Sequence, residues 1–302
     1  VFRSQQRDEP RSNCDETRST ALGRRSAHPY LRSADSSANE GENTTMKKVL
    51  LGAAAALALT LPGVASAQSA YVDLGYQSSE ADVGGVSGDA DGWTLGGAAA
   101  WGGNGSLGFQ VDGLISSTDA DGGGDTDAWN IGGHLFTRND AYLFGGFVNY
   151  GDVDVDGAGD FDFWTVGLEG QLYLQRTTLD GALSYSEGDD ADAELTAADV
   201  GLTHFFTDNF SFGGNVGFGN IDTPLGDTDV VSYGLGAEWQ FASLPVSVFG
   251  GWQHAEIDDI DADSDTLGIG VRYNFGGSLF DRNRSGASLS RGGGLGRFGG
   301  LL

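Results

Sequence analysis

The sequence predicts an all-β fold, a transmembrane antiparallel up-and-down β-barrel of twelve strands. Three features predict it. Short runs alternate apolar with small or polar residues, these runs recur at regular spacing between residues 68 and 275, and the segments that join them are alternately short and Asp-rich. Alternation of this kind indicates β-strands, because successive side chains of a strand point to opposite faces.

The alternating runs can be assigned one by one. In each, one parity is apolar or aromatic and the other is mainly glycine, alanine, serine or threonine. No later segment reaches the length of about 20 apolar residues that a membrane-spanning helix needs, so a multi-span helical protein is excluded. The twelve runs are 72–76, 93–101, 107–115, 129–135, 142–150, 164–174, 179–185, 200–206, 210–218, 231–241, 246–252 and 267–275.

The connections alternate between two kinds. Short turns are expected at 102–106, 138–140, 175–177, 207–209 and 242–245. Long Asp-rich loops are expected at 80–91, 117–127, 151–162, 187–197, 220–229 and 256–265. Short turns on one side and long loops on the other are typical of barrels with periplasmic turns and extracellular loops.

A soluble β-sandwich is the alternative fold. It would cover its outer face with mixed charge, whereas the second parity here is small and contains almost no lysine or arginine. Aromatic residues also gather at both strand ends, for example Trp93, Trp129 and Trp164 at one end and Trp101 and Trp239 at the other. Two such belts match the interfacial girdles of a barrel in lipid, so the barrel is favoured.

The charge and the cysteine content exclude several classes of protein. The chain has 43 Asp and Glu against 16 Lys and Arg, a formal charge of −27. Nucleic acid is therefore not an expected partner, because a phosphate backbone requires a basic surface. Cys14 is the only cysteine, which excludes an internal disulfide and a zinc–thiolate site.

The N-terminal part predicts export. Met46 is followed by two lysines, an apolar run and a small-residue site with Ala65 and Ala67, the pattern of a secretory signal peptide. We therefore expect residues 46–67 to be a signal peptide cleaved after Ala67, and residues 1–45 to be a disordered extension or a mis-assigned start. Residues 68–275 would form the barrel and residues 276–302 a flexible Gly/Ser/Arg-rich tail.

The last predicted strand resembles the C-terminal signature of Gram-negative outer-membrane β-barrels, a final aromatic preceded by alternating apolar positions. The matching residues are Leu267, Ile269, Val271, Tyr273 and Phe275. The resemblance implies recognition by the barrel-assembly machinery and contact with outer-membrane lipid and lipopolysaccharide. It departs from the family in one respect, because the aromatic is usually the last residue and here residues 276–302 follow it.

Function is expected in the lumen or in the loops, since the apolar parity faces lipid. The inward parity is otherwise rich in small residues, which leave space, and unpaired charges would be costly in a dry interior. Arg272 among carboxylates has a second interpretation, an internal ion-pair plug. The candidate lumen and selectivity residues are Asp112, His134, Glu169, Asp180, Glu238 and Arg272.

Neither a dedicated metal site nor a catalytic site is predicted. The segment that contains Asp152, Asp154 and Asp156 begins with the pattern of an EF-hand calcium loop. However, Phe163 occupies the position of the last carboxylate ligand, and no flanking helices are expected. Weak calcium or magnesium binding is conceivable there, and a solvated acidic surface is the favoured alternative. No serine accompanies a histidine at hydrolase spacing, so we expect neither an enzyme nor a cofactor.

These features predict a porin-like channel for passive diffusion of small hydrophilic solutes, with a preference for cations. The rival hypothesis is a sealed structural or adhesive outer-membrane barrel with acidic surface loops. Small inward residues favour the channel, and the narrowness of twelve strands favours the rival. The oligomeric state and the identity of the solute remain open.

Overall fold

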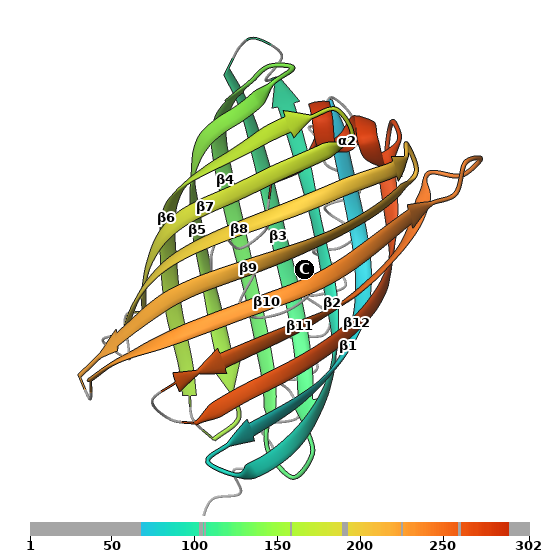
Figure 1. Ribbon diagram of the computed structural model, residues 1–302. Helices are drawn as coiled ribbons and strands as arrows, with labels where there is room; N and C mark the ends of the chain where they lie inside the picture. Colours follow the sequence, from blue (N-terminus) through green and yellow to red (C-terminus); the bar gives the residue numbers. More distant parts are fainter. Residues whose placement is uncertain are drawn as a thin grey trace, which may run out of the picture. The chain divides into compact units, whose positions relative to one another are not determined.

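The computed structural model describes residues 68–289 apart from 103–104, 106, 158, 189–192, 225 and 259–260. These residues form a closed antiparallel barrel in which each strand pairs with its neighbours in sequence and β1 pairs with β12 (Figure 1). The predicted fold class and strand number are confirmed. The predictions for residues 1–45, for the signal peptide with Ala65 and Ala67, and for residues 290–302 lie outside the described residues.

The strands are longer than the alternating runs from which they were predicted. Their bounds are β1 Ser69–Val83, β2 Val86–Gly102, β3 Leu107–Ala120, β4 Asp125–Arg138, β5 Tyr142–Val155, β6 Gly159–Leu174, β7 Thr177–Gly188, β8 Ala193–Thr207, β9 Phe210–Thr223, β10 Gly226–Gln240, β11 Val246–Ile257 and β12 Ala262–Phe275.

The barrel carries its large apolar side chains outside and its polar side chains inside. Ile269 is 65% exposed and Leu183 is 61% exposed, whereas Asp73 on the opposite parity is 2% exposed. A water-soluble sheet would show the reverse arrangement. The outer apolar band is what a wall in contact with hydrocarbon requires, and closure of the sheet leaves no unpaired strand edge in lipid.

Aromatic side chains form two bands on the outer face, as predicted. At one end, neighbouring strands bring Trp129 against Tyr150, with ring centroids 5.8 Å apart, in an edge-to-face contact. At the other end, Tyr273 packs on Phe275 at 4.9 Å. These amphipathic rings are suited to the two membrane–water interfaces and therefore delimit the spanning part of the barrel.

The expectation of long Asp-rich loops is wrong. Those segments continue as paired strands, and their hairpins close in turns as short as those at the opposite end. Gly84 and Gly85, for example, form a two-residue turn between β1 and β2 with φ of 60° and 84°, conformations that glycine adopts without steric cost. We call this end of the barrel the acidic end, and the end that carries Ser69 and Phe275 the terminal end.

One short helix, α2 (Leu279–Ser285), follows the last strand and lies at the terminal end (Figure 1). Ser278 caps it: the Ser278 hydroxyl accepts from the Asp281 amide, and the Asp281 carboxylate accepts from the Ser278 amide at 3.0 Å. This reciprocal capping box stabilises the first turn. Among the described residues, no helix combines the length and apolar character needed to cross a membrane.

Candidate functional site in the barrel lumen

The candidate site is the lumen, whose wall is the inward parity of the strands. The structure places every lumen residue predicted from the sequence on this inner face, either buried in it or lining its cavity: Asp112, His134, Glu169, Asp180, Glu238 and Arg272.

Three of these residues form one buried cluster across β3, β4 and β6. The Nε2 atom of His134 lies 2.8 Å from Asp112, and its Nδ1 atom lies 2.8 Å from Glu169. Carboxylate oxygens can only accept hydrogen bonds, so both imidazole nitrogens must donate. The cluster must therefore carry one proton more than a neutral imidazole and two carboxylates would carry. Gln110 donates to the same Asp112 oxygen that pairs with His134, at 3.0 Å. The cluster joins three strands and holds its charges in fixed positions.

A second polar cluster surrounds Arg272 on β12. Its guanidinium donates to Asp73 at 2.9 Å and to Glu238 at 2.7 Å, and it lies over the rings of Tyr71 and Phe249 at 4.4 and 4.8 Å. Arg272 therefore forms internal ion pairs, as its second interpretation expected, and its role as a plug stays a prediction. Paired in this way, the buried charges avoid most of the desolvation penalty.

One side of the lumen is filled by large side chains that the sequence analysis did not single out. Phe136, Leu143 and Tyr173 form a buried cluster there, and the Phe147 ring packs over Gly167, where a Cβ atom would overlap it. The signal was present, because these residues follow the inward parity of β4, β5 and β6. It was overlooked because large apolar residues were assigned to the lipid-facing side alone.

The other side of the lumen is open. A cavity of about 370 Å³ lies along β7–β12. Its wall includes small or polar inward residues such as Gly201, Gly213 and Asn215, together with Asp180 and Gln253. A passage through this barrel would follow this side, because the opposite side is packed with aromatic rings.

The segment after the barrel departs from the expectation of a flexible tail. Residues 276–289, which we call the plug segment, turn back into the terminal end of the lumen. The turn uses Gly276 and Gly277, with φ of 104° and 72°, and the segment buries Leu279, Ala287 and Leu289. The glycine-rich composition suggested flexibility, but its first glycines make the turn and the following residues pack against the wall.

The plug segment contacts several sides of the barrel wall. Ala287 packs with Tyr71 and the small residues of β2, and Leu289 packs with the Phe136 cluster of β4–β6. Its polar contacts come from β3, β4, β6, β7, β10 and β12: Gln110 with Leu289, Arg138 with Gly286 and Ser288, Gln171 with Ser288, Thr178 with Asn283, Glu238 with Arg282, and Asn274 with Arg282. The segment thus crosses the lumen and also forms part of the cavity lining.

The Asp-rich segments line the outside of the barrel rather than its mouth. On β5, Leu143, Phe147 and Asn149 are buried inside, so the alternation of the strand places Asp152 and Asp154 on the outer face, beyond the outward Tyr150. The same alternation places at least one carboxylate of each strand on the outer face at the acidic end. We call this ring the outer carboxylate belt.

Carboxylates of the belt face one another across neighbouring strands. Asp152 is paired in register with Asp162, and Asp154 with Asp127 and Asp160; Asp156 lies in the following turn. Such like-charge pairs are destabilising when solvated and unbridged. The geometry offers no enclosed ligand set at Asp152, Asp154 and Asp156, so calcium or magnesium binding there stays a prediction.

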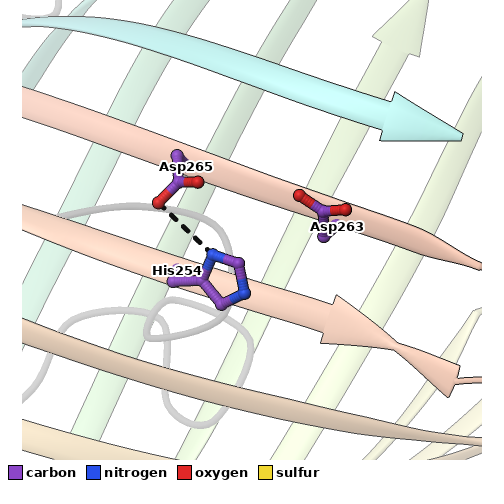
Figure 2. A group of neighbouring side chains, drawn as sticks. All are labelled: His254, Asp263 and Asp265. Atoms are coloured by element: carbon purple, nitrogen blue, oxygen red, sulfur yellow. Dashed lines mark ion pairs between the residues drawn. The ribbon is translucent and has the colours of Figure 1, made fainter. Parts of the chain in front are cut away.

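One part of the belt contains a histidine. Figure 2 shows His254 of β11 beside Asp263 and Asp265 of β12, and the His254 Nδ1 atom lies 3.3 Å from Asp265. Potential ligand atoms of the three side chains lie within 4.8 Å of one another. Trp252 also donates to Asp265 at 2.8 Å. A polar contact between a partly buried histidine and an exposed aspartate accounts for this arrangement, and we assign no metal to it.

The predicted assembly signature lies on the outer face of β12. Leu267, Ile269, Val271 and Tyr273 are exposed at alternate positions, and Phe275 ends the strand against Tyr273. This arrangement would leave the side chains available to an external partner during insertion. Recognition by the assembly machinery itself stays a prediction.

Comparison with known proteins agrees with the fold. A family model described as Gram-negative porin matches residues 168–279, and no curated protein sequence matches significantly. The chain is similar in structure to an outer-membrane channel from Pseudomonas putida F1, with a TM-score of 0.56, 11% identity, and coverage of 68% of this chain and 95% of that chain. It is also similar to the translocator domain of the autotransporter NalP from Neisseria meningitidis, with a TM-score of 0.49, 14% identity, and coverage of 79% and 98%.

Family match, barrel architecture and aromatic bands agree on one location. The chain is a β-barrel of the Gram-negative outer membrane, and its residues 168–279 are similar to Gram-negative porins. Its outward apolar band therefore contacts membrane lipid.

Proposed function

We propose that this outer-membrane barrel is a channel for passive diffusion of small hydrophilic solutes, with a preference for cations. In this proposal the terminal end faces the periplasm and the acidic end faces the cell surface, the usual orientation of barrels whose two chain ends lie together. Solutes would pass along the β7–β12 side. The proposal includes no catalytic step and no cofactor.

The single observation that carries the proposal is the cavity of about 370 Å³ beside Asp180 and Gln253. A structural barrel gains stability from a filled interior, because empty space forfeits dispersion contacts. Here a cavity remains beside small or polar inward residues such as Gly213 and Asn215. Polar lining groups can replace part of the hydration shell of a passing solute.

The cation preference rests on the charges of the inner wall. Among the barrel residues, carboxylates outnumber guanidinium groups, and the Glu169–His134–Asp112 cluster retains one net negative charge when the imidazole is protonated. Such a wall attracts cations and repels anions at short range. The inward carboxylates are Asp73, Asp112, Glu169, Asp180, Asp199 and Glu238, against Arg138 and Arg272.

A sealed structural or adhesive barrel is the second candidate, and one observation favours it. The plug segment crosses the lumen at the terminal end and would seal it. The function would then lie on the outer carboxylate belt. In that case the belt would meet lipopolysaccharide through divalent cations, because both surfaces are anionic.

The test uses a variant that ends at Phe275 and therefore lacks the plug segment. Its folding is checked by the difference in gel migration between unheated and boiled samples, which a closed barrel shows in detergent. Folded variant in planar bilayers should give stepwise currents, with reversal potentials in a salt gradient that indicate cation preference. Absence of current from folded barrels would refute the channel and favour the sealed barrel, and anion preference would refute the selectivity.

A further inference from the structure

The plug segment is attached to the barrel differently from the way the strands are attached to one another. Each strand is held by a continuous ladder of backbone hydrogen bonds, whereas the plug segment is held mainly by side chains. Thr178 donates to Asn283 at 2.6 Å, and Arg282 pairs with Glu238 at 2.6 Å. The segment can therefore leave the lumen without breaking any strand pairing, as a locally unfolding unit.

Arg138 holds the plug segment, but its burial carries a desolvation cost that departure of the plug would relieve. Arg138 is 1% exposed, and its Nη2 atom donates to the Gly286 carbonyl and the Ser288 hydroxyl, both at 3.0 Å. Its Nε and Nη1 atoms are buried without a hydrogen-bond partner. A buried guanidinium with unused donors is costly, and departure of the plug would return these donors to water. The hydrogen bonds of Arg138 Nη2 thus help to hold the closed state, and the desolvation of its other two donors opposes that state.

The plug segment also changes the charge of the lumen. It brings Arg282 to Glu238, a carboxylate that already pairs with Arg272, and it brings Arg284 to the carbonyl groups of Gln175 and Thr177 at 2.7 and 3.1 Å. With the plug in place, Glu238 faces two guanidinium groups. After release it faces one, and the wall becomes more negative.

We propose that residues 276–289 are a releasable plug that determines both the conductance and the charge selectivity of the barrel. This inference rests on the proposed channel function. The resident plug closes the terminal end of the lumen, and solutes pass while it is displaced. Cation preference is then strongest in the open state, because displacement removes Arg282 from the lumen and Arg284 from the rim of the terminal end.

A reversible crosslink tests the plug in the full chain. The double variant Thr178→Cys/Asn283→Cys, made with Cys14→Ser, replaces two side chains that are hydrogen-bonded across the plug and β7. Loss of free thiols on oxidation shows that the disulfide has formed before currents are recorded. Oxidised protein in a planar bilayer should stay closed, and reduction should restore current. We expect the mean current to rise at least about tenfold, which corresponds to about 1.4 kcal/mol.

The matched control introduces a pair of cysteines into two neighbouring strands of the wall, away from the plug segment. Ser79 and Thr266 face each other on β1 and β12, with hydroxyl oxygens 2.9 Å apart. Ser79→Cys/Thr266→Cys should crosslink without a change in current on reduction. The variant that ends at Phe275 provides the open reference and should be more cation-selective than the reduced full chain.

The outcomes separate this proposal from the channel itself. Closure on oxidation, with current from the reduced and the truncated proteins, supports the plug. Equal currents from oxidised, reduced and truncated proteins would overturn the plug and leave the channel standing. No current from a folded truncated barrel would overturn the channel function, whatever the crosslink does.

Discussion

Removing one carboxylate from the cavity should change ion selectivity far more than removing two from the outer belt. The cavity variant is Asp180→Asn, because Asp180 lines the open side of the lumen. The belt variant is Asp152→Asn/Asp154→Asn. Glu169 is a poorer probe, since His134 beside it can give up its proton and cancel part of the change. All variants are made in the truncated chain ending at Phe275, so that the lumen is open.

The magnitudes follow from the dimensions of the barrel. Twelve strands spaced about 4.8 Å apart and tilted about 40° give a radius of about 12 Å. An outward carboxylate then lies about 15 Å from the axis, whereas an ion in the cavity passes about 6 Å from Asp180. In water, a unit charge contributes about 0.7 kcal/mol at 6 Å and about 0.3 kcal/mol at 15 Å before screening.

Screening separates the two sites further. With a Debye length of about 10 Å at 0.1 M salt, the cation-to-anion permeability ratio should fall about fourfold for Asp180→Asn and about 1.5-fold for the belt variant. At 1 M salt the Debye length is about 3 Å, so Asp180→Asn should still have an effect of about 1.4-fold and the belt variant none.

The assay is the reversal potential across a KCl gradient, recorded at both salt ranges from barrels whose migration shifts on heating. An effect of the belt variant equal to that of Asp180→Asn at low salt would refute this reasoning. It would mean that the carboxylates of the belt reach the ion path, contrary to their outward position. No effect of Asp180→Asn at either salt would place the ion path elsewhere in the lumen.

Three further predictions concern packing, charge and processing. Gly167→Ala should lower the free energy of unfolding by about 1–3 kcal/mol in a thermal unfolding assay, because the new methyl group would overlap the Phe147 ring. The control Gly133→Ala has open space around it and should be nearly neutral in the same assay. Asp152→Asn removes the like-charge cross-strand pair with Asp162 and should raise stability by up to about 1 kcal/mol at low salt, a gain that 1 M salt should abolish. Mass spectrometry of the outer-membrane form should find Gln68 at the N-terminus, and peptides from residues 1–45 in that form would contradict the predicted cleavage.

The barrel itself could be predicted because its signal is local. A strand alternates its faces at every residue, so the side of the wall that each residue occupies can be inferred without knowing its neighbours in space. Trp129 and Ile269 were assigned outward and Asp112 inward on this basis, and the structure agrees. The two aromatic bands were predictable for the same reason.

The same rule, applied further, would have placed the acidic segments correctly. Asp152, Val153, Asp154 and Val155 alternate as a strand does, yet aspartate is rare in strands and was interpreted as a loop signal. Pairing with β4 and β6 overrides this weak preference. The consequence is large, because a carboxylate over the mouth acts on every ion that enters, and one on the outer wall acts weakly.

The sequence alone determined the periodicity, the number of strands and the side of the wall for most residues of the alternating runs. Only the tertiary structure decided which of those residues meet. His134 lies between Asp112 and Glu169 because β3, β4 and β6 curve round the lumen, and no spacing along the chain encodes that meeting. The plug segment left a local trace, the Ser278–Asp281 capping box, but its position depends on Arg138, Thr178 and Glu238, which lie on separate strands. Closure of the barrel brings these strands around one lumen, and contacts made across that space are invisible to any pattern along the chain.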